Sequence, residues 1–480
     1  MLTLTLILFP LLMAVAIVVL GAKLARQVAL GTAGVELLLT VWAVYLYKTG
    51  NTTLLYFNEP WLQSLGVSFN FAMDGISLVL VLLSAISAPL IIYASFNKAF
   101  KNPHIFYGLV LAMIGGMIGA FTANDGLIFY LFYELSLIPI YFIILIWGSD
   151  ENKARITLKF FLYTLFGSLF MLVALLYVYH HTATGSFAFA DLYEAGRSLS
   201  VTEQGLVFGG IFLAFAVKMP VFPFHTWQPS TYNAAPTAGT LLLAAIMLKM
   251  ATYGLIRLII PMVPDGLEEY KNWAIGLSVL SILYASGMAI MQKNYKLLIA
   301  YSSIAHVGMI SAGILTNNVQ GIQGGLVEMM SHGILAIGLF FVYDILSSRL
   351  GHDEMKTMGG IREANPQFAF LFFVIVMGSV ALPFTSGFVG EFLLIAGLAQ
   401  HHAIYAGVAG LTVILGAVYM LRAFQWMMLG GVNSRTQNFA PLTRHEKTVL
   451  IVVVVLVIAL GVYPKPLLEL SEGAVEMLMG

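Results

Sequence analysis

Four ionisable side chains lie inside apolar segments long enough to cross a membrane, namely Glu134, Lys218, Lys249 and Glu391. An ionisable group at the depth of a bilayer costs roughly 2.5–3.5 kcal/mol on insertion scales. Burial favours the neutral form of a lysine and a nearby carboxylate favours its charged form, so a lysine beside a carboxylate can switch its charge state. The four residues therefore predict that the chain moves a charge, most economically a proton, across a membrane.

Each of the four residues also has a purely structural explanation. Glu134 could bond to a neighbouring helix, Lys218 could extend to an interface, Lys249 could serve packing, and Glu391 could cap a helix. We expect proton chemistry instead: Glu134 exchanges a proton or sets the charge of a lysine, and Lys218 is the lysine that switches. Lys249 then relays protons from Lys218, and Glu391 is the last protonatable group.

Three histidines and one further glutamate are weaker candidates. His225, His306 and His332 lie in or beside apolar segments. Neutral imidazole passes protons through hydrogen bonds and titrates nearest physiological pH, although a lone histidine on an apolar helix is more often a packed residue. Glu328 lies one turn before His332 on the same helix face, which favours that pair. We expect no metal centre, because no local group of residues has ligand spacing.

The composition is that of a membrane protein. The 480 residues are 60% hydrophobic and 10% charged, whereas soluble domains are about 25% charged. The formal net charge of zero argues against nucleic-acid binding, and the absence of cysteine removes disulfides and thiolate-bound clusters. Residues 2–20 lack a basic leader region and a cleavage site, so we expect a retained first span.

A spanning helix needs about 20 mostly apolar residues, and fourteen segments of this chain qualify. We therefore predict an all-α polytopic membrane protein with about fourteen transmembrane helices. The predicted spans are 2–21, 28–47, 75–97, 104–123, 125–148, 157–180, 203–230, 237–262, 270–292, 297–316, 318–347, 366–400, 403–430 and 446–464. Residues 49–74 are expected to form a loop or short hairpin at the surface, and residues 183–202 a polar loop.

The distribution of basic residues supports this count. Most of the 23 lysines and arginines fall in the connections after odd-numbered spans, among them Lys98, Lys153, Lys296 and Arg349. Cytoplasmic loops are enriched in such residues, so we expect these connections in the cytoplasm and both termini outside. One missed span would destroy the alternation.

Two of the predicted spans contain helix breakers. The seventh carries Pro220 and Pro223 directly after Lys218, and the twelfth carries Pro383 before Gly387. Proline interrupts a helix, and a broken helix is tolerated in lipid only where protein or a wet cavity satisfies the freed backbone groups. Breaks five spans apart indicate two inverted five-helix repeats, spans 4–8 and 9–13. The predicted domains are 1–103, 104–262 (first repeat), 263–430 (second repeat) and 431–480.

Motifs along nearly the whole chain resemble one family, the antiporter-like membrane subunits of respiratory complex I (proton-translocating NADH:quinone oxidoreductase). The motifs are Asp74-Gly-Ile-Ser77, the segment around Glu134, Lys159-Phe-Phe-Leu-Tyr163, Lys218-Met-Pro-Val-Phe-Pro-Phe-His225-Thr-Trp227, Ala235-Pro-Thr-Ala-Gly239, Lys249, Leu298-Ile-Ala-Tyr-Ser-Ser303, Ser331-His-Gly333 and Thr385-Ser-Gly-Phe-Val-Gly-Glu391-Phe392. A glutamate at Glu391 is typical of the M-type branch, which is the counterpart of mitochondrial subunit 4, whereas the L- and N-type branches typically carry lysine.

The resemblance implies a pairing of Glu134 with Lys218, a link through Lys249 towards the second half, and Glu391 as the exit group. It implies proton transfer driven by quinone reduction elsewhere in the complex, with no cofactor on this chain. FMN, iron–sulfur clusters, NADH and quinone are expected on other subunits. The implied partners are L-type and N-type membrane subunits and lipids, in a bacterial inner membrane.

The chain departs from the family pattern at a few positions. After Trp227 the family usually reads Leu-Pro-Asp-Ala-His, whereas this chain has Gln228-Pro-Ser230-Thr-Tyr232. Ser230 and Tyr232 cannot replace an acidic or imidazole relay, which puts a role of that segment in proton uptake in doubt. Asn294 stands where an aspartate is common, and Glu328 where a neutral residue such as glutamine is expected.

Three other functions remain open from the sequence. A related subunit of a multisubunit cation/proton antiporter or of a membrane-bound hydrogenase would share these motifs. A stand-alone solute/H⁺ symporter would need a polar substrate pocket, while the residues near the breaks are mainly titratable. A structural membrane spacer would leave the four buried charges without a reason.

Overall fold

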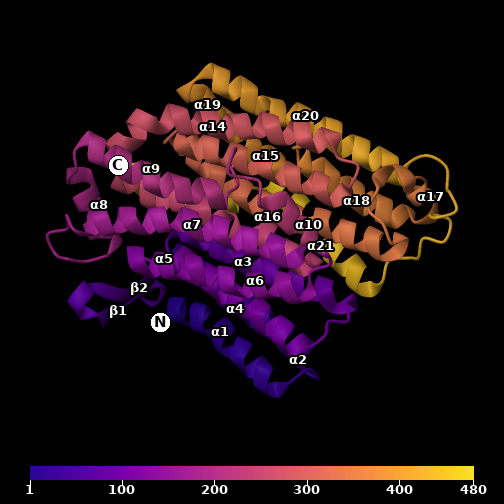
Figure 1. Cartoon of the computed structure of the whole chain (residues 1–480), viewed down its shortest axis with the longest axis horizontal. Helices are drawn as coiled ribbons and strands as arrows, with labels where there is room; N and C mark the ends of the chain where they lie inside the picture. Colours follow the sequence, from indigo (N-terminus) through magenta and orange to yellow (C-terminus); the bar gives the residue numbers. More distant parts are fainter. Residues whose placement is uncertain (480) are drawn as a thin grey trace.

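The molecule is built almost entirely from helices that lie side by side (Figure 1), as a computed structural model covering residues 1–479 describes it. Thirteen helical segments are long and apolar enough to cross a membrane. They are Leu2–Leu20, Ala25–Lys48, Gly75–Asn97, Pro103–Thr122, Gly126–Trp147, Lys153–Tyr179, Val201–Lys218, Thr237–Met262, Pro264–Met291, Tyr295–Leu315, Val319–Leu350, Ala403–Met428 and Arg444–Val462. The remaining predicted span, 366–400, is present as two shorter helices, α18 (Pro366–Ser379) and α19 (Ser386–His401). The predicted class of an all-α polytopic membrane protein is confirmed.

Several of these segments are single helices. They are α1 (Leu2–Leu20), α2 (Ala25–Lys48), α3 (Gly75–Ala94), α4 (Pro103–Thr122), α7 (Lys153–Tyr179), α9 (Val201–Lys218), α14 (Pro264–Met291), α15 (Tyr295–Leu315), α16 (Val319–Leu350), α20 (Ala403–Met428) and α21 (Arg444–Val462). Short 3₁₀ turns flank them at η1 (Thr53–Leu55), η2 (Gln63–Leu65), η3 (Ser95–Asn97) and η6 (Met355–Thr357), and a single α-helical turn, α17, spans Ile361–Ala364.

Two segments are internally divided. The fifth is interrupted at Ser136 between α5 (Gly126–Leu135) and α6 (Leu137–Trp147). The eighth is a mixture of α11 (Thr237–Leu242), α12 (Lys249–Gly254) and α13 (Ile260–Met262) with two π-helical turns, η4 (Leu243–Met247) and η5 (Leu255–Ile259). Isolated π turns inside α-helices occur frequently at functional sites.

Both predicted helix breaks are present. Helix α9 ends at Lys218, and the chain passes through a turn holding Pro220 and Pro223 before α10 (Gln228–Ala234) begins. Helix α18 ends at Ser379, and six residues separate it from the start of α19 at Ser386. The inverted relation of the two five-helix groups stays a prediction.

A hairpin and a short helix, α8, lie outside the spans. Residues 56–72 form an antiparallel hairpin of β1 (Tyr56–Leu62) and β2 (Val67–Ala72), one of the two forms predicted for 49–74. The prediction of a plain loop at 183–202 is wrong, because it contains helix α8 (Phe189–Ser198). There Leu192, Ala195 and Gly196 are buried at helical spacing, while the charged residues point outward.

A further helix, α22 (Lys465–Met479), follows the last span and was not predicted. It packs on α3 at Gly75, where any Cβ would collide with the carbonyl group of Leu470. A residue larger than glycine at position 75 would push the two helices apart.

The helices differ in how much of their surface is buried inside the protein. In the apolar stretch of α16 that would cross the membrane, every residue is buried, whereas in the equivalent stretches of α1, α2 and α20 only about a third of the residues are buried. The outer helices therefore present apolar faces to lipid, and α15, α16 and the α11–α13 segment form a protein-enclosed centre in which polar side chains can be held.

The two ends of the helix bundle differ. Both termini lie at one end together with the hairpin and α8, as Figure 1 shows. The opposite end, which we call the basic end, carries Lys98, Lys153, Lys296 and Arg349.

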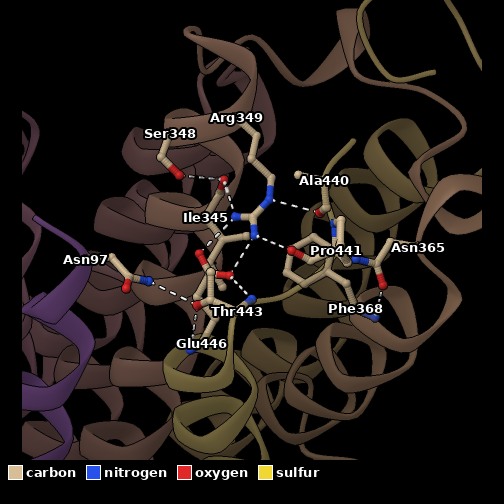
Figure 2. A network of polar contacts seen from close by, with 10 residues as sticks. All are labelled: Asn97, Ile345, Ser348, Arg349, Asn365, Phe368, Ala440, Pro441, Thr443 and Glu446. Atoms are coloured by element: carbon tan, nitrogen blue, oxygen red, sulfur yellow. Dashed lines mark hydrogen bonds and ion pairs between the residues drawn. The ribbon is translucent and has the colours of Figure 1, made fainter. Parts of the chain in front are cut away.

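A polar network fastens the basic end (Figure 2). Arg349, in the last turn of α16, donates to both carboxylate oxygens of Glu446 on α21 at 2.9 and 2.6 Å. It also donates to the carbonyls of Ala440 and Pro441. Bidentate arginine–carboxylate pairs fix orientation as well as charge, so this network ties α16 to α21 and to the connection before it.

Candidate functional site

A row of buried polar side chains crosses the enclosed centre. Lys249 Nζ lies 2.7 Å from His332 Nδ1, and the rings of His332 and His306 are 5.8 Å apart. His306 Nδ1 lies 3.2 Å from Glu391 Oε1. These four residues come from four elements, α12, α16, α15 and α19, and each is buried. Four residues predicted separately are thus brought into one line.

The local backbone explains the position of Lys249. It is the first residue of α12, directly after the π turn η4, and its ammonium also donates to the carbonyl of Ala244 at 2.6 Å. The π turn changes the register of the side chains, and the lysine contacts one of its carbonyls. Lys249 is therefore held by one carbonyl and one imidazole, with no carboxylate in direct contact within residues 1–479.

Glu391 lies in a cluster with a second carboxyl group. His306 Nδ1 is 3.9 Å from Glu328 Oε1. One ring nitrogen of His306 and one carboxylate oxygen each of Glu328 and Glu391 lie within 4.8 Å of one another. The predicted pairing of Glu328 with His332 is replaced by this contact, since His332 turns towards Lys249. Spacing along the chain could not reveal this cluster of one imidazole and two carboxyl groups, because its members come from three helices.

Gly390 makes the carboxyl cluster possible. A Cβ on Gly390 would lie 2.5 Å from Glu328 Oε2 and 2.8 Å from its Cα. Only glycine lets α19 approach α16 this closely. A cavity of about 20 Å³ adjoins the cluster, lined in part by Ser303, His306, Glu328 and His332. That volume holds about one water molecule, beside both imidazole rings.

Lys218 lies at the first break. Its ammonium donates to the carbonyl of Tyr133 at 3.0 Å and to Ser136 Oγ at 3.5 Å, and it lies 3.6 Å from the centre of the Tyr133 ring. It is the last residue of α9 and contacts the last turn of α5. Helix C-termini favour cations, so two helix ends stabilise the charged lysine.

Glu134 follows Tyr133 directly, but it makes no direct ion pair with Lys218. The two side chains are further apart than 4.0 Å, and Glu134 Oε1 is buried without a hydrogen-bond partner in residues 1–479. The lysine is thus held by backbone and ring, whereas the Glu134 carboxyl has a side-chain hydrogen bond from Ser168 and one buried oxygen without a partner.

The candidate residues form two groups. Within residues 1–479, no hydrogen bond joins the Glu134–Lys218 group to the line that begins at Lys249. His225 belongs to neither: its ring packs against Tyr284 with centroids 4.7 Å apart. The structure therefore does not place His225 with the other candidates.

One buried carboxyl escaped the sequence reasoning. Glu36 on α2 is 1% exposed, and neither of its carboxylate oxygens has a partner within residues 1–479. The signal that could have revealed it is its place in the apolar run Val35-Glu36-Leu37.

A partly buried ion pair lies near the end that holds the termini. Asp74 caps α3 through Ser77 and contacts the Arg257 guanidinium. Burial raises the pKa of Asp74, but Arg257 and the hydrogen bonds from Ser77 outweigh it and hold this pKa below the usual value.

Residues 123–417 match the family described as NADH:quinone oxidoreductase/Mrp antiporter, TM. NADH-quinone oxidoreductase subunit M of Rickettsia prowazekii (strain Madrid E) is 37% identical over 459 residues, which cover 95% of this chain and 93% of that protein. A chain of respiratory complex I from Thermus thermophilus with bound NADH superposes with a TM-score of 0.90 at 29% identity, each chain covered completely. A chain of the Mrp complex from Dietzia sp. DQ12-45-1b shares the fold at 22% identity, with a TM-score of 0.87 over 100% of this chain and 98% of that one.

Proposed function

The chain belongs to the NADH:quinone oxidoreductase/Mrp antiporter family of membrane subunits, as a homologue of complex I subunit M, and we propose that it moves protons along the buried residues described above. The observation that carries the proposal is the line Lys249–His332–His306–Glu391, with contacts of 2.7 and 3.2 Å at its two ends and 5.8 Å between the two ring centres. Imidazoles placed between an amine and a carboxyl group suit proton transfer.

The Glu134–Lys218 group acts as the switch. Quinone reduction elsewhere in the complex shifts a charge at the boundary of this subunit, and the carboxyl of Glu134 responds by moving relative to Lys218. The ammonium of Lys218 is stabilised by two helix ends and by the Tyr133 carbonyl, so the approach or withdrawal of one carboxylate tips its charge state. The changed charge then drives a proton away from Lys249.

The proton leaves Lys249 through the two imidazoles. His332 accepts it at Nδ1, one water in the 20 Å³ cavity bridges the two rings, and His306 delivers it to the carboxyl pair. Two carboxylates so close together are strongly disfavoured, so Glu328 and Glu391 share one proton in the resting state. Glu328 therefore serves as an additional protonation site, and Glu391 is the exit.

We also propose a setting for the subunit. We place it beside L-type and N-type membrane subunits in a bacterial inner membrane, with the basic end in the cytoplasm and both termini outside. The two halves are taken as inverted repeats of spans 4–8 and 9–13. FMN, iron–sulfur clusters, NADH and quinone are bound by other subunits.

A cation/proton antiporter subunit is the second candidate. The similarity to a chain of the Mrp complex supports this candidate only through the shared fold, because the two sequences are 22% identical. The 37% identity to a complex I subunit over 95% of the chain favours the first proposal.

The test compares pumping per electron in the assembled complex. Glu134→Gln and Lys218→Ala should each lower the number of protons pumped per NADH oxidised. The control is Glu151→Gln, a carboxylate in the exposed connection before α7, which should pump normally. Unchanged pumping per electron in both switch variants would refute this mechanism.

A further inference from the structure

A large cavity at the basic end lies outside the line of residues described so far. It measures about 400 Å³ and is bounded by the ends of α3, α6, α11, α15 and α16. This volume has room for on the order of ten water molecules. Its lining includes three charged side chains, Lys98, Lys296 and Asp344, and the hydroxyl-bearing residues Thr237 and Ser347.

Asp344 is the one carboxylate among the lining residues in the described part of the chain. Its Oδ1 accepts from Thr237 Oγ1 at 2.5 Å and lies 3.0 Å from Lys98 Nζ. Both contacts use the same oxygen, so Oδ2 is available to take up a proton. The side chain is 13% exposed, and that of Lys98 is 37% exposed, which places the pair where the cavity meets solvent.

The second lysine of the cavity is satisfied elsewhere. Lys296 Nζ donates to the carbonyls of Asn233 and Ala235 at 3.1 and 2.8 Å and lies 5.1 Å from the Tyr343 ring centre. It does not compete for Asp344.

The inner end of the cavity points towards Lys249. The lining reaches Leu241 in α11, three residues before Ala244, whose carbonyl binds the Lys249 ammonium. Three residues of helix rise about 4.5 Å. Less than one helical turn therefore separates the floor of the cavity from the partner of Lys249, and the π turn η4 begins in that interval, at Leu243.

The neighbouring helix offers no alternative acceptor. Helix α10 (Gln228–Ala234) contains no acidic residue or histidine. Ser230 bonds to the carbonyl of Trp227, and the Tyr232 side chain is fully buried. Helix α10 therefore supplies no proton acceptor, and the carboxylate that lines the cavity is Asp344 on α16.

We propose that this cavity is the proton intake of the subunit and that Asp344 is its first protein acceptor. The Asp344 carboxylate takes a proton from a hydronium ion and releases water. It then passes the proton through cavity water as far as Leu241 and, across the remaining step beside the π turn η4, to the neutral amine of Lys249, and it returns to a carboxylate. The inference rests on the proposed function, because it supplies the lysine with which the inner line begins.

The first experiment blocks the cavity after folding. The chain has no cysteine, so Ser347→Cys places a single thiol of this subunit in the cavity lining, and Ser348→Cys places one on the exposed neighbour as a matched control. The purified complex is treated with a small cationic methanethiosulfonate, reconstituted in liposomes and assayed for NADH-driven pumping. Wild-type complex treated in the same way controls for cysteines of other subunits.

Labelled Ser347→Cys should pump about tenfold more slowly. Complete loss of a proton acceptor typically slows a reaction by about 100-fold or more, and water that remains in the labelled cavity should reduce that effect. A reducing agent should restore the rate, and labelled Ser348→Cys should match wild type. Equal rates for the two labelled variants would overturn the proposal.

The second experiment changes the acceptor itself. Asp344→Asn keeps an oxygen for Thr237 but cannot take a proton, whereas Asp344→Glu can. The asparagine variant should slow pumping about tenfold and the glutamate variant less than about twofold. If Asp344→Asn pumps normally while Lys249→Ala does not, the intake is elsewhere and the inner line stands. If Lys249→Ala also pumps normally, the proposed function and the intake both fail.

Discussion

Replacing His332 by phenylalanine should slow proton transfer more than replacing it by alanine. Phenylalanine keeps the volume of a ring but has no nitrogen to meet Lys249, which lies 2.7 Å from His332 Nδ1. Alanine leaves a space that adjoins the 20 Å³ cavity, and a polar space of this size admits water. Water in the alanine variant can bridge Lys249 and His306, whereas the phenyl ring excludes it.

The structure sets the size of the effect. A hydrogen bond to a charged group contributes about 1.5–3 kcal/mol. At about 1.4 kcal/mol for each tenfold change in rate, its complete loss slows the transfer about 10- to 100-fold. We expect that range for His332→Phe and about tenfold or less for His332→Ala.

The assay is NADH-driven acidification of inverted membrane vesicles, followed with a pH-sensitive dye beside NADH oxidation. The same two substitutions at His225, which contacts Tyr284 and none of the line, form the control and should leave pumping unchanged. A packing role predicts the opposite order, because alanine creates a void and phenylalanine does not. Slower pumping in His332→Ala than in His332→Phe would therefore refute the relay.

Two further predictions concern stability. Arg349→Ala leaves the nearly buried Glu446 carboxylate unpaired, which should cost about 3–5 kcal/mol and lower the share of complex that stays intact on heating in detergent. Pumping per NADH in the surviving complex should be normal, and a reduced value would give Arg349 a part in transfer. Asp74→Asn should destabilise the complex equally at about pH 7 and about pH 5, because Arg257 holds the Asp74 pKa below its usual value and the wild-type contribution disappears only as the pH falls through that lowered pKa. Melting curves in which the difference has closed by about pH 5 would contradict this pairing.

The sequence predicted the helices well, because long apolar runs and prolines act locally. The breaks after Lys218 and before Ser386 were both located from proline, since a missing donor disrupts its own helix whatever surrounds it. The interruption at Ser136 and the π turns around Lys249 were missed. Pro139 could have located the first, because a proline cannot donate to the carbonyl four residues earlier, here that of Leu135. The π turns have no residue type that forces them and depend on packing against neighbouring helices.

The sequence predicted which residues form the site, but it did not predict how they are arranged in space. Lys249, His332, His306 and Glu391 each stood out as a polar group in an apolar run, but their order in space depends on how four helices pack. Glu328 was assigned to His332 by spacing along one helix, whereas the closer partner is His306 on another helix. Asp344 was overlooked because it lies near a helix end, where an acidic residue is ordinary.

The contact between Gly75 and Leu470 has a consequence for biogenesis. Helix α3 is inserted early, yet its first turn is completed only by α22, nearly four hundred residues later. During synthesis the surface at the start of α3 therefore stays uncovered until α22 leaves the ribosome. We therefore expect the nascent chain to need shielding by lipid or an insertion factor throughout that interval, and chains cut short before α22 to be degraded although all of their spans have been inserted.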